Sequence, residues 1–364
     1  MLMDDKKKVA EESIEPPKKE NIPMPLIAVA VTIGVLLFLT VWLVSFAGCM
    51  FDRTEPAETE TETEKETREV SYPIATSAKR DSYLPKTEDS TQLITATVDA
   101  KYAALVDLSD YRVIASKKGD EKIYPASMTK VMTLIVACDH VTDPDEIITV
   151  SAEIVERLKD SGASVMSLSA GEQISVRSLL YGLIMKSAGD AAQVLAEHIA
   201  GSEEAFVSLM NQKAAQMGLT QTHFVNCTGL HSDDHYTTCK EMAAIFAYAL
   251  DNAFTKDVLT AREYNAPAYY EKDFVYYIKA GWATNFTDYN LSLNLSNGLT
   301  VCGGKTGYTA DTYDDAGNPE KNHCLVTCAK SSDGHVYVLV TAGGTGVAKG
   351  RATDATTIYT TYIK

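Results

Sequence analysis

The chain has 364 residues, of which 45% are hydrophobic and 23% are charged, a composition typical of a folded protein with additional segments. Its formal net charge of -16 would repel a phosphate backbone, and no basic stripe interleaved with aromatic residues is present. We therefore do not expect the protein to bind nucleic acid.

The first part of the chain is predicted to cross a membrane. Residues 26–47 carry no charged side chain, and a helix of this length would span about 33 Å, close to the thickness of a bilayer's hydrocarbon core. Several basic residues precede this segment, and they include Lys6, Lys7, Lys8, Lys18 and Lys19. We expect a cytoplasmic tail over residues 1–23, a single transmembrane helix over residues 24–48, and the rest of the chain outside the cell membrane.

Two other interpretations of this segment are open. A cleaved secretory signal would be removed from the mature protein, although the apolar core of such signals usually has only about 7 to 15 residues. The segment Phe46-Ala47-Gly48-Cys49 is also similar to a bacterial lipobox, in which Cys49 would be lipidated after cleavage. The long apolar core and the phenylalanine at the first position are unusual for a lipobox.

An acidic stalk is predicted to follow the membrane segment. Residues 49–92 contain few apolar side chains, and residues 54–69 are nearly a repeat of threonine and glutamate. Such a segment cannot bury a core, and repulsion between its carboxylates favours extended conformations. We expect a disordered stalk over residues 49–92 and a folded domain over residues 93–364.

The folded domain is predicted to contain strands at both ends and helices between them. Runs of β-branched and apolar residues predict strands over residues 101–107, 111–116, 299–308, 322–330 and 335–342. Apolar residues at helical spacing predict helices over residues 128–139, 176–185, 191–200, 202–217, 239–251 and 348–363. These elements predict an α/β domain in which a five-stranded antiparallel sheet joins the two chain ends, with helices on both faces and an all-helical middle.

Three short motifs carry residues that could perform chemistry. Ser127 and Lys130 lie three residues apart at the start of a helix that is apolar on nearly every face, so the amine can reach the hydroxyl. The motif Ser187-Ala188-Gly189 falls in the bend between two predicted helices. Lys305-Thr306-Gly307 lies on a predicted strand beside two further glycines, which would let the backbone of a substrate approach closely.

These motifs and the sequence around them resemble one family of enzymes. Residues from about 93 to 364 are similar to the D-alanyl-D-alanine carboxypeptidases, the low-molecular-weight penicillin-binding proteins of serine peptidase family S11. Beyond the motifs, the resemblance rests on Ala104-Leu105-Val106-Asp107, Gly182-Leu183-Ile184, Thr222-His223-Phe224-Val225-Asn226 and His235-Tyr236-Thr237-Thr238. It implies the fold that β-lactamases share with transpeptidases.

The resemblance also implies a role for each motif residue. Ser127 would attack the carbonyl between the two terminal D-alanines of a peptidoglycan stem pentapeptide and form an acyl-enzyme, which water would then hydrolyse. Lys130 would be the base, because burial beside a second cation such as Lys305 lowers the pKa of an amine. Ser187 would relay a proton to the leaving amine. The substrate would be bound by Lys305, Thr306, Gly307, Tyr308 and Gly189.

Two further properties follow from the same resemblance. The backbone N–H groups of Ser127 and Tyr308 would form an oxyanion hole for the tetrahedral intermediate. β-Lactams would acylate Ser127 in place of the peptide substrate.

Two positions depart from the pattern of the family. The middle motif is usually Ser-x-Asn, and its asparagine contacts the catalytic lysine and the substrate amide, but Gly189 occupies that place. The family also tends to carry a basic residue ahead of the Lys-Thr-Gly strand, whereas residues 294–298 contain none. These departures predict slow turnover or a somewhat different substrate, and they make a peptidoglycan-binding pseudoenzyme an alternative function. A class A β-lactamase is a further alternative, although the Glu-x-x-Leu-Asn segment of that class is absent from the sequence.

The cysteines are expected to have structural roles, in disulfides or in packing. Cys227 and Cys239 could close a short loop through a disulfide, and Cys302 and Cys328 on neighbouring strands could form a bridge or remain reduced. Cys138 is expected to pack inside its helix.

The segment His231-Ser232-Asp233-Asp234-His235 has a spacing that could hold a metal. We expect it to order a loop instead, and we predict that the protein uses no metal and no cofactor. Because the sequence stops after the closing helix, we expect no β-rich C-terminal domain. We also expect a monomer, attached to the membrane by its N-terminal helix.

Overall fold

The computed structural model describes residues 82–159, 161–265, 295–313, 319–346 and 350–364, together with residue 317 and the short segments 271–272, 275–276 and 282–283. The chain separates into two compact units, Met1–Glu69 and Val70–Lys364, and all described residues belong to the second. The predicted membrane helix and most of the predicted stalk lie outside the described residues. Within the part that is described, no helix is both long and apolar enough to cross a bilayer.

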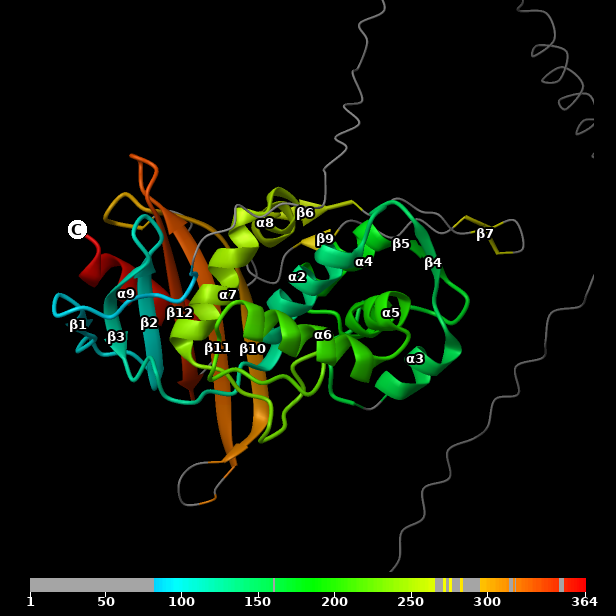
Figure 1. Cartoon of the computed structure of the whole chain (residues 1–364), viewed down its shortest axis with the longest axis horizontal. Coiled ribbons are helices and arrows are strands. Elements are labelled where there is room, and N and C mark those ends of the chain that lie inside the picture. Colours follow the sequence, from blue (N-terminus) through cyan, green and yellow to red (C-terminus); the bar gives the residue numbers. More distant parts are fainter. Residues whose placement is uncertain are drawn as a thin grey trace, which may run out of the picture. The chain divides into compact units, whose positions relative to one another are not determined.

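One sheet forms one half of the domain, beside a helical half, and its strands come from both ends of the chain (Figure 1). The strands are β1 (Gln92–Leu93), β2 (Tyr102–Asp107), β3 (Arg112–Lys117), β10 (Thr300–Tyr313), β11 (Pro319–Lys330) and β12 (Val336–Gly344). Their order is β1-β3-β2-β12-β11-β10, and the five longer strands pair antiparallel as predicted. The sixth, β1, corrects the predicted strand count, because it pairs parallel with β3 through two residues and is too short to show an alternating pattern.

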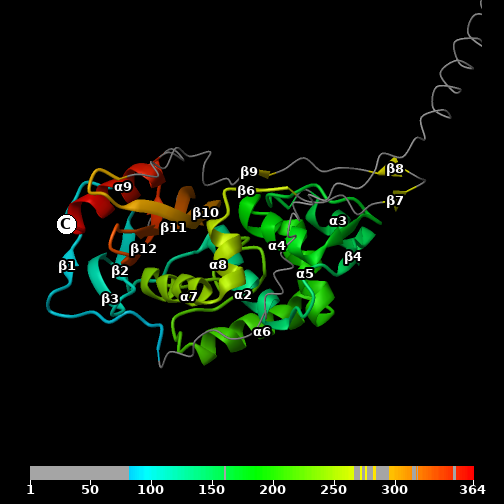
Figure 2. The same cartoon turned by 90° about the horizontal axis from the view of Figure 1, so that it is seen from above.

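Alternation along the strands divides the apolar side chains between two cores. In β2, Ala104 and Val106 belong to the larger core and Ala103 and Leu105 to the smaller one. The smaller core is covered by α9 (Gly350–Tyr362), whereas α7 (Cys239–Asp251) contributes to the larger core on the other face. Figure 2 shows the sheet between these two helices. The prediction of a sheet with helices on both faces is therefore confirmed.

The helical half of the domain surrounds α2 (Lys130–His140), in which residues 130–138 are all buried. A helix that is buried on every side can lie only in the centre of a domain. Around it lie η1 (Ala126–Thr129, a 3-10 turn), α3 (Ala152–Leu158), α4 (Val176–Met185), α5 (Gly189–Ala200), α6 (Glu203–Gln216) and α8 (Ala253–Thr260).

The middle of the chain is not wholly helical, which corrects the prediction. The strands β4 (Ile147–Thr149) and β5 (Gln173–Ser175) form an antiparallel pair. Two further pairs join β6 (Glu263–Tyr264) to β9 (Trp282–Ala283) and β7 (Glu271–Lys272) to β8 (Val275–Tyr276). Strands of two or three residues carry too little periodicity to be recognised in a sequence.

Polar side chains determine where most of these helices begin. Ser151, Ser175, Ser202 and Thr238 each accept a hydrogen bond from the backbone N–H three residues later, at the starts of α3, α4, α6 and α7. Asn252 caps α8 in a similar way. Each such cap stabilises a helix by about 1 kcal/mol, so the helix starts are set locally.

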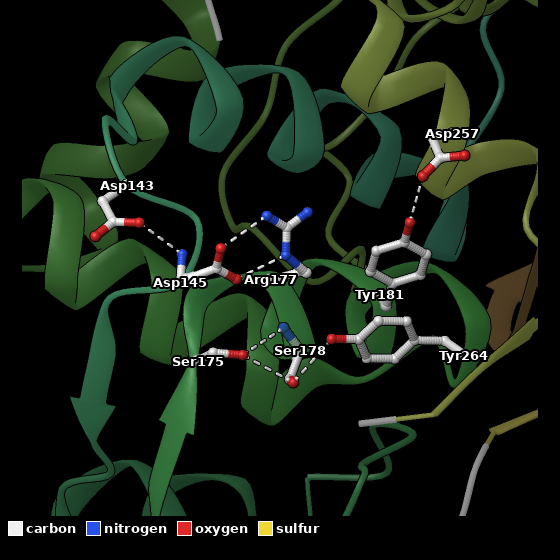
Figure 3. A network of polar contacts seen from close by, with 8 residues as sticks. All are labelled: Asp143, Asp145, Ser175, Arg177, Ser178, Tyr181, Asp257 and Tyr264. Carbon is white, nitrogen blue, oxygen red and sulfur yellow. Dashed lines mark hydrogen bonds and ion pairs between the residues drawn. The ribbon is translucent and has the colours of Figure 1, made fainter. Parts of the chain in front are cut away.

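A polar network joins α4 to α8 and to β6 (Figure 3). Arg177 in the first turn of α4 donates from Nε and Nη2 to the Asp145 carboxylate, at 2.8 and 3.0 Å. The Tyr181 hydroxyl donates to Asp257 Oδ2 of α8 at 2.5 Å, and its ring stacks on that of Tyr264 with the centroids 4.0 Å apart. The network therefore holds α8 against α4, and α8 in turn packs on β10.

The folded domain begins before residue 93. Tyr83 is buried in the larger core, where its ring lies edge-on to those of Tyr111 and Tyr248. Its hydroxyl donates to Asp251 at the end of α7, at 2.9 Å. The predicted stalk therefore ends earlier than residue 92. Tyr83 is a single aromatic side chain in a polar sequence, and its burial holds this segment on the domain.

The six described cysteines are free thiols. The disulfide considered between Cys227 and Cys239 is therefore not formed, and both side chains are buried. Cys138 packs inside α2 as predicted. Cys328 is buried and Cys302 is half-buried, and this pair also remains reduced.

Candidate active site

Ser127 lies in a tight turn that precedes the central helix. The turn is η1 and α2 begins at Lys130, so the serine is presented ahead of the buried helix rather than within it. Ala126 has a left-handed φ of 48°, which is uncommon outside glycine and tends to occur at functional sites. Lys130 Nζ donates to Ser127 Oγ at 3.1 Å and to the Thr228 carbonyl at 2.5 Å. The structure thus brings the predicted nucleophile and base into hydrogen-bond distance.

Two glycines let other segments approach this turn. A Cβ atom on Gly307 of β10 would lie only 2.8 Å from the Pro125 carbonyl oxygen. Gly229 has a φ of 85°, and a Cβ there would lie 2.0 Å from the Ala126 carbonyl oxygen. The turn is therefore enclosed between β10 and the segment around Gly229, which explains why glycine ends the Lys-Thr-Gly motif.

Ser187 and Lys305 form the second pair of the site. Ser187 lies in the bend between α4 and α5 and has a left-handed φ of 56°. Lys305 of β10 is 2% exposed, and its Nζ donates to Ser187 Oγ at 2.9 Å and to the Thr306 carbonyl at 2.7 Å. Each of the two serine hydroxyls thus accepts a hydrogen bond from a buried lysine.

Both pairs adjoin one cavity with a volume of about 330 Å³. Of the predicted residues, those that line it are Ser127, Lys130, Ser187, Thr306, Gly307 and Tyr308. Lys305 is not a lining residue, but it donates a hydrogen bond to Ser187, which is. Gly189 does not line the cavity either. Three segments far apart in the sequence therefore converge on one cavity.

The two lysines of the site have lowered pKa values. Burial lowers the pKa of Lys130 to about 8, against the opposing influence of Cys227 and Asp190. The pKa of Lys305 lies well below its ordinary value, first because of burial and then because of the charges of Lys130 and Arg351. The lowered pKa predicted for Lys130 is thus confirmed in direction, and the burial part of the predicted cause is confirmed, whereas a second cation is not among the causes.

Residues 161–164 take the space that a side chain at position 189 would need. A Cβ atom on Gly189 would lie 3.1 Å from the Ala163 Cβ and 3.3 Å from the Ser164 carbonyl oxygen. The Gly189 N–H donates to that carbonyl at 2.7 Å. Residues 161–164 also line the cavity, so this segment packs where a side chain at position 189 would begin.

Asp190 holds the residues that follow this segment. Its buried carboxylate accepts hydrogen bonds from the N–H groups of Met166 and Leu168, each at 3.0 Å. It also accepts from the N–H of Ala191 at 3.0 Å. A carboxylate next to Gly189 thus fixes the wall of the cavity without lining it.

The sequence-based prediction missed one cation of the site. Arg351 lies in the first turn of α9, is 6% exposed and lines the cavity. Its Nη1 donates to the Gly307 carbonyl at 2.7 Å. Residues 294–298, ahead of β10, contain no basic residue, whereas Arg351 comes from the helix that follows the last strand. The available signal was an arginine beside Ala352 and Ala355, on the face of α9 that is buried.

His235 supports the turn that carries Ser127. Its Nδ1 accepts from the Val225 N–H at 3.2 Å, so Nε2 carries the proton and donates to Thr129 Oγ1 at 2.7 Å. Burial lowers the pKa of His235 to about 3, which keeps the ring neutral. This contact agrees with the predicted loop-ordering role. Among the residues that the structure describes, no group of three or more His, Cys, Asp or Glu is arranged to hold a metal. That the protein uses no metal or cofactor stays a prediction.

The sequence matches a known family over most of this domain. Residues 87–344 match Peptidase_S11, D-alanyl-D-alanine carboxypeptidase. The chain is 29% identical over 258 residues to the D-alanyl-D-alanine carboxypeptidase DacF of Bacillus subtilis (strain 168), covering 71% of this chain and 60% of that protein. It is 35% identical over 222 residues to DacC of Escherichia coli (strain K12), covering 59% and 51%. The chain thus spans only part of the length of these curated relatives.

Solved structures share the fold. The Streptomyces K15 DD-transpeptidase aligns with a TM-score of 0.64 at 25% identity, covering 73% of this chain and 97% of that one. Penicillin binding protein 5 from Haemophilus influenzae aligns with a TM-score of 0.59 at 25% identity, covering 71% and 69%. These structures confirm the predicted fold class. With the family match extending over most of the domain, the chain belongs to the D-alanyl-D-alanine carboxypeptidase family of serine peptidases, S11.

Proposed function

We propose that the domain is a serine D,D-carboxypeptidase that removes the terminal D-alanine from peptidoglycan stem pentapeptides through an acyl-enzyme on Ser127. The observation that carries the proposal is the 3.1 Å contact between Lys130 Nζ and Ser127 Oγ, beside the Lys305–Ser187 pair. With a pKa lowered to about 8, about one tenth of the Lys130 amines are neutral at pH 7 and able to act as a base.

Acylation begins when Lys130 accepts the hydroxyl proton of Ser127. The serine oxygen then attacks the carbonyl carbon of the peptide bond between the two D-alanines. We assign the oxyanion of the resulting tetrahedral intermediate to the backbone N–H groups of Ser127 and Tyr308, since both residues line the cavity. The same attack on a β-lactam carbonyl would leave the drug attached to Ser127.

Expulsion of D-alanine requires a proton on its nitrogen. The Ser187 hydroxyl, which accepts a hydrogen bond from Lys305, is placed to donate that proton and to recover one from the Lys130 ammonium group. The C–N bond breaks, and D-alanine leaves as the amine. In the second half of the reaction neutral Lys130 takes a proton from water, which attacks the acyl ester and restores the Ser127 hydroxyl.

A terminal carboxylate on the substrate matches the charge of the cavity. Lys305 and Arg351 place buried positive charge beside Thr306 and Gly307. A carboxylate bound there would raise the pKa of Lys305 back toward its ordinary value, since an opposite charge favours the charged amine. This supports a preference for peptides with a free C-terminus.

Two assays test the proposal. A soluble fragment of residues 70–364 should release D-alanine from a pentapeptide ending in D-Ala-D-Ala, and fluorescent penicillin should label it. Ser127→Ala should abolish both, whereas Ser208→Ala on the exposed face of α6 should change neither. Labelling without release of D-alanine would favour the pseudoenzyme, and rapid hydrolysis of a chromogenic cephalosporin would favour a β-lactamase.

We further propose that residues 24–48 anchor the protein in the bacterial cell membrane, that residues 1–23 remain in the cytoplasm, and that a stalk carries the monomeric domain outside. The proposal rests on the uncharged segment and the lysines before it. The intact mass of membrane-extracted protein tests it, because a species that begins at Cys49 would exclude a retained helix.

A further inference from the structure

A second cavity lies away from the proposed active site. It has a volume of about 720 Å³ and lies among the β2–β3 turn, the ends of α7 and α8, and strands β10 to β12. Two cysteines, Cys302 and Cys328, and two lysines, Lys256 and Lys330, are among the residues that line it. Acyl transfer at Ser127 uses none of these four side chains.

A β-bulge turns both thiols to the same side of the sheet. Val301 pairs with Ala329 and Gly303 pairs with Cys328, so Cys302 is the extra residue between two ladder positions. In a bulge, two residues of one strand oppose a single residue of the other. Cys302 and Cys328 both pack on the larger core, whereas Val301 belongs to the smaller one. The two thiols therefore lie on adjacent strands and on the same face.

The two thiols differ in exposure and in charge. Cys302 is half-buried and Cys328 is 2% exposed. A hydrogen bond with Cys328 lowers the pKa of Cys302 to about 7, against the effect of burial, and the charges of Lys330, Lys256 and Arg262 act in the same direction. The same hydrogen bond raises the pKa of Cys328. Cys302 is thus the thiol that ionises first and faces the cavity.

Acidic residues at this cavity are engaged by other groups. Asp251 accepts a hydrogen bond from Tyr83 at 2.9 Å. Asp333 accepts one from Ser331 and lies 3.8 Å from His335 Nε2. The charges that favour a thiolate on Cys302 are those of Lys330, Lys256 and Arg262.

We propose that Cys302 and Cys328 are a redox-active dithiol, which a hydroperoxide converts into a cross-strand disulfide. The Cys302 thiolate attacks the O–O bond, an S–O bond forms, and the second oxygen leaves with a proton as an alcohol or water. The Cys328 thiol then loses its proton and attacks the Cys302 sulfur, which releases water and forms the S–S bond. In total, two thiols lose two electrons and two protons, and one hydroperoxide is reduced.

The disulfide would fix the strand that carries the Lys-Thr-Gly motif. Cys302 precedes Lys305 by three residues in β10. A Cβ atom on Gly303 would lie 2.4 Å from the Leu259 carbonyl oxygen, so the backbone at the bulge is also in contact with the end of α8. A cross-link at this point would tie β10 to β11 and raise the resistance of the domain to thermal unfolding.

Peptide mapping of the oxidised protein tests the proposal. The full-length protein is treated with hydrogen peroxide, alkylated, digested and analysed by mass spectrometry. We expect a peptide that links Cys302 to Cys328, lighter by two hydrogens than the reduced pair and separated again by dithiothreitol. Cys302→Ser should abolish the linked peptide. Cys324→Ser, which removes a buried thiol four residues earlier in β11, should retain it.

A second variant identifies the attacking thiol. In Cys328→Ala, peroxide should leave a sulfenic acid on Cys302 that dimedone traps, and near-ultraviolet circular dichroism checks that this variant is folded. The wild-type result decides the proposal even if the variant does not fold. Oxidation of Cys302 without a link to Cys328, or two thiols that remain open to alkylation after peroxide treatment, would overturn it.

Discussion

The cations of the candidate active-site cavity and those of the network between α4 and α8 have different kinds of hydrogen-bond partner. In the network, Arg177 lies against Asp145, the bond to that carboxylate raises the pKa of the arginine, and the arginine lowers the pKa of Asp145. In the cavity, Lys130 and Lys305 are bonded to hydroxyl and carbonyl oxygens, and burial lowers the pKa values of both amines. A cation bonded to a carboxylate keeps its proton and holds elements together, whereas a buried amine bonded only to neutral oxygens in the described structure can give its proton up.

Removing the base should produce the largest effect. Lys130→Met keeps an unbranched side chain in the buried site but cannot accept the Ser127 proton, so we expect the acylation rate with fluorescent penicillin to fall by about a thousandfold. The acylation rate is measured by stopping the labelling reaction at fixed times. Lys159→Met is the matched control, because that lysine is exposed and pairs with Glu156 on the surface. A variant that retains more than about a tenth of the wild-type rate would mean that Lys130 is not the base.

The pH dependence of acylation should report the lowered pKa of Lys130. Only the neutral amine can act, so the rate should rise with pH, with a midpoint near the pKa of about 8, and should fall about tenfold for each unit below that value. Second-order labelling rates between about pH 5.5 and 9 would provide the profile. A rate that still rises about tenfold per unit up to pH 9, without levelling off, would show that burial does not tune this amine.

Restoring the usual asparagine should reduce activity rather than improve it. In Gly189→Asn the new Cβ would press on Ala163 and Ser164, and overpacking of this kind costs about 1 to 3 kcal/mol. We expect D-alanine release to slow by about tenfold or more, because the displaced segment is a wall of the cavity. Gly171→Asn is the control, since nothing lies within 4 Å of its Cβ and asparagine tolerates the left-handed φ of 77°. Faster release in Gly189→Asn would show that the contacts with Ala163 and Ser164 do not exclude a side chain at this position.

Local patterns explain why much of this molecule can be predicted from its sequence. The spacing of Ser127 and Lys130, and the apolar helix that follows them, fix the proposed base beside the proposed nucleophile within one turn. The alternation in β2 fixes both faces of the sheet. These features depend on residues close together in the chain.

The features that could not be predicted depend on contacts between distant segments. Arg351 reaches the cavity from the last helix, where it donates a hydrogen bond to the Gly307 carbonyl. No local sequence pattern predicts this contact. The bulge at Cys302 breaks the alternation of β10 and turns that side chain to the face of Lys305. Segment 161–164 has no periodicity, so its place beside Gly189 follows only from the fold.

The hydroxyl of Tyr181 offers a smaller test of the network. Tyr181→Phe keeps the ring that stacks on Tyr264 but removes the bond to Asp257, so we expect a loss of about 1 kcal/mol in the free energy of unfolding. Urea denaturation measures this loss. Labelling of Ser127 should not change, and a large fall in labelling would mean that the network also positions the active site.

The smallest effect is expected for the exposed end of the network. In Asp145→Asn the ion pair with Arg177 is lost, but 65% of the aspartate side chain is exposed, and such pairs contribute about 0 to 1 kcal/mol. The pKa of Asp145 is lowered, chiefly by its hydrogen bond from Arg177, so its contribution is present above the unfolded value of 3.8 and is lost as the pH falls through the lower, folded value. Urea denaturation at pH 7 and at about pH 3 should therefore show a small difference between variant and wild type that shrinks in acid. A difference that grows in acid would contradict the assignment of a paired, ionised carboxylate.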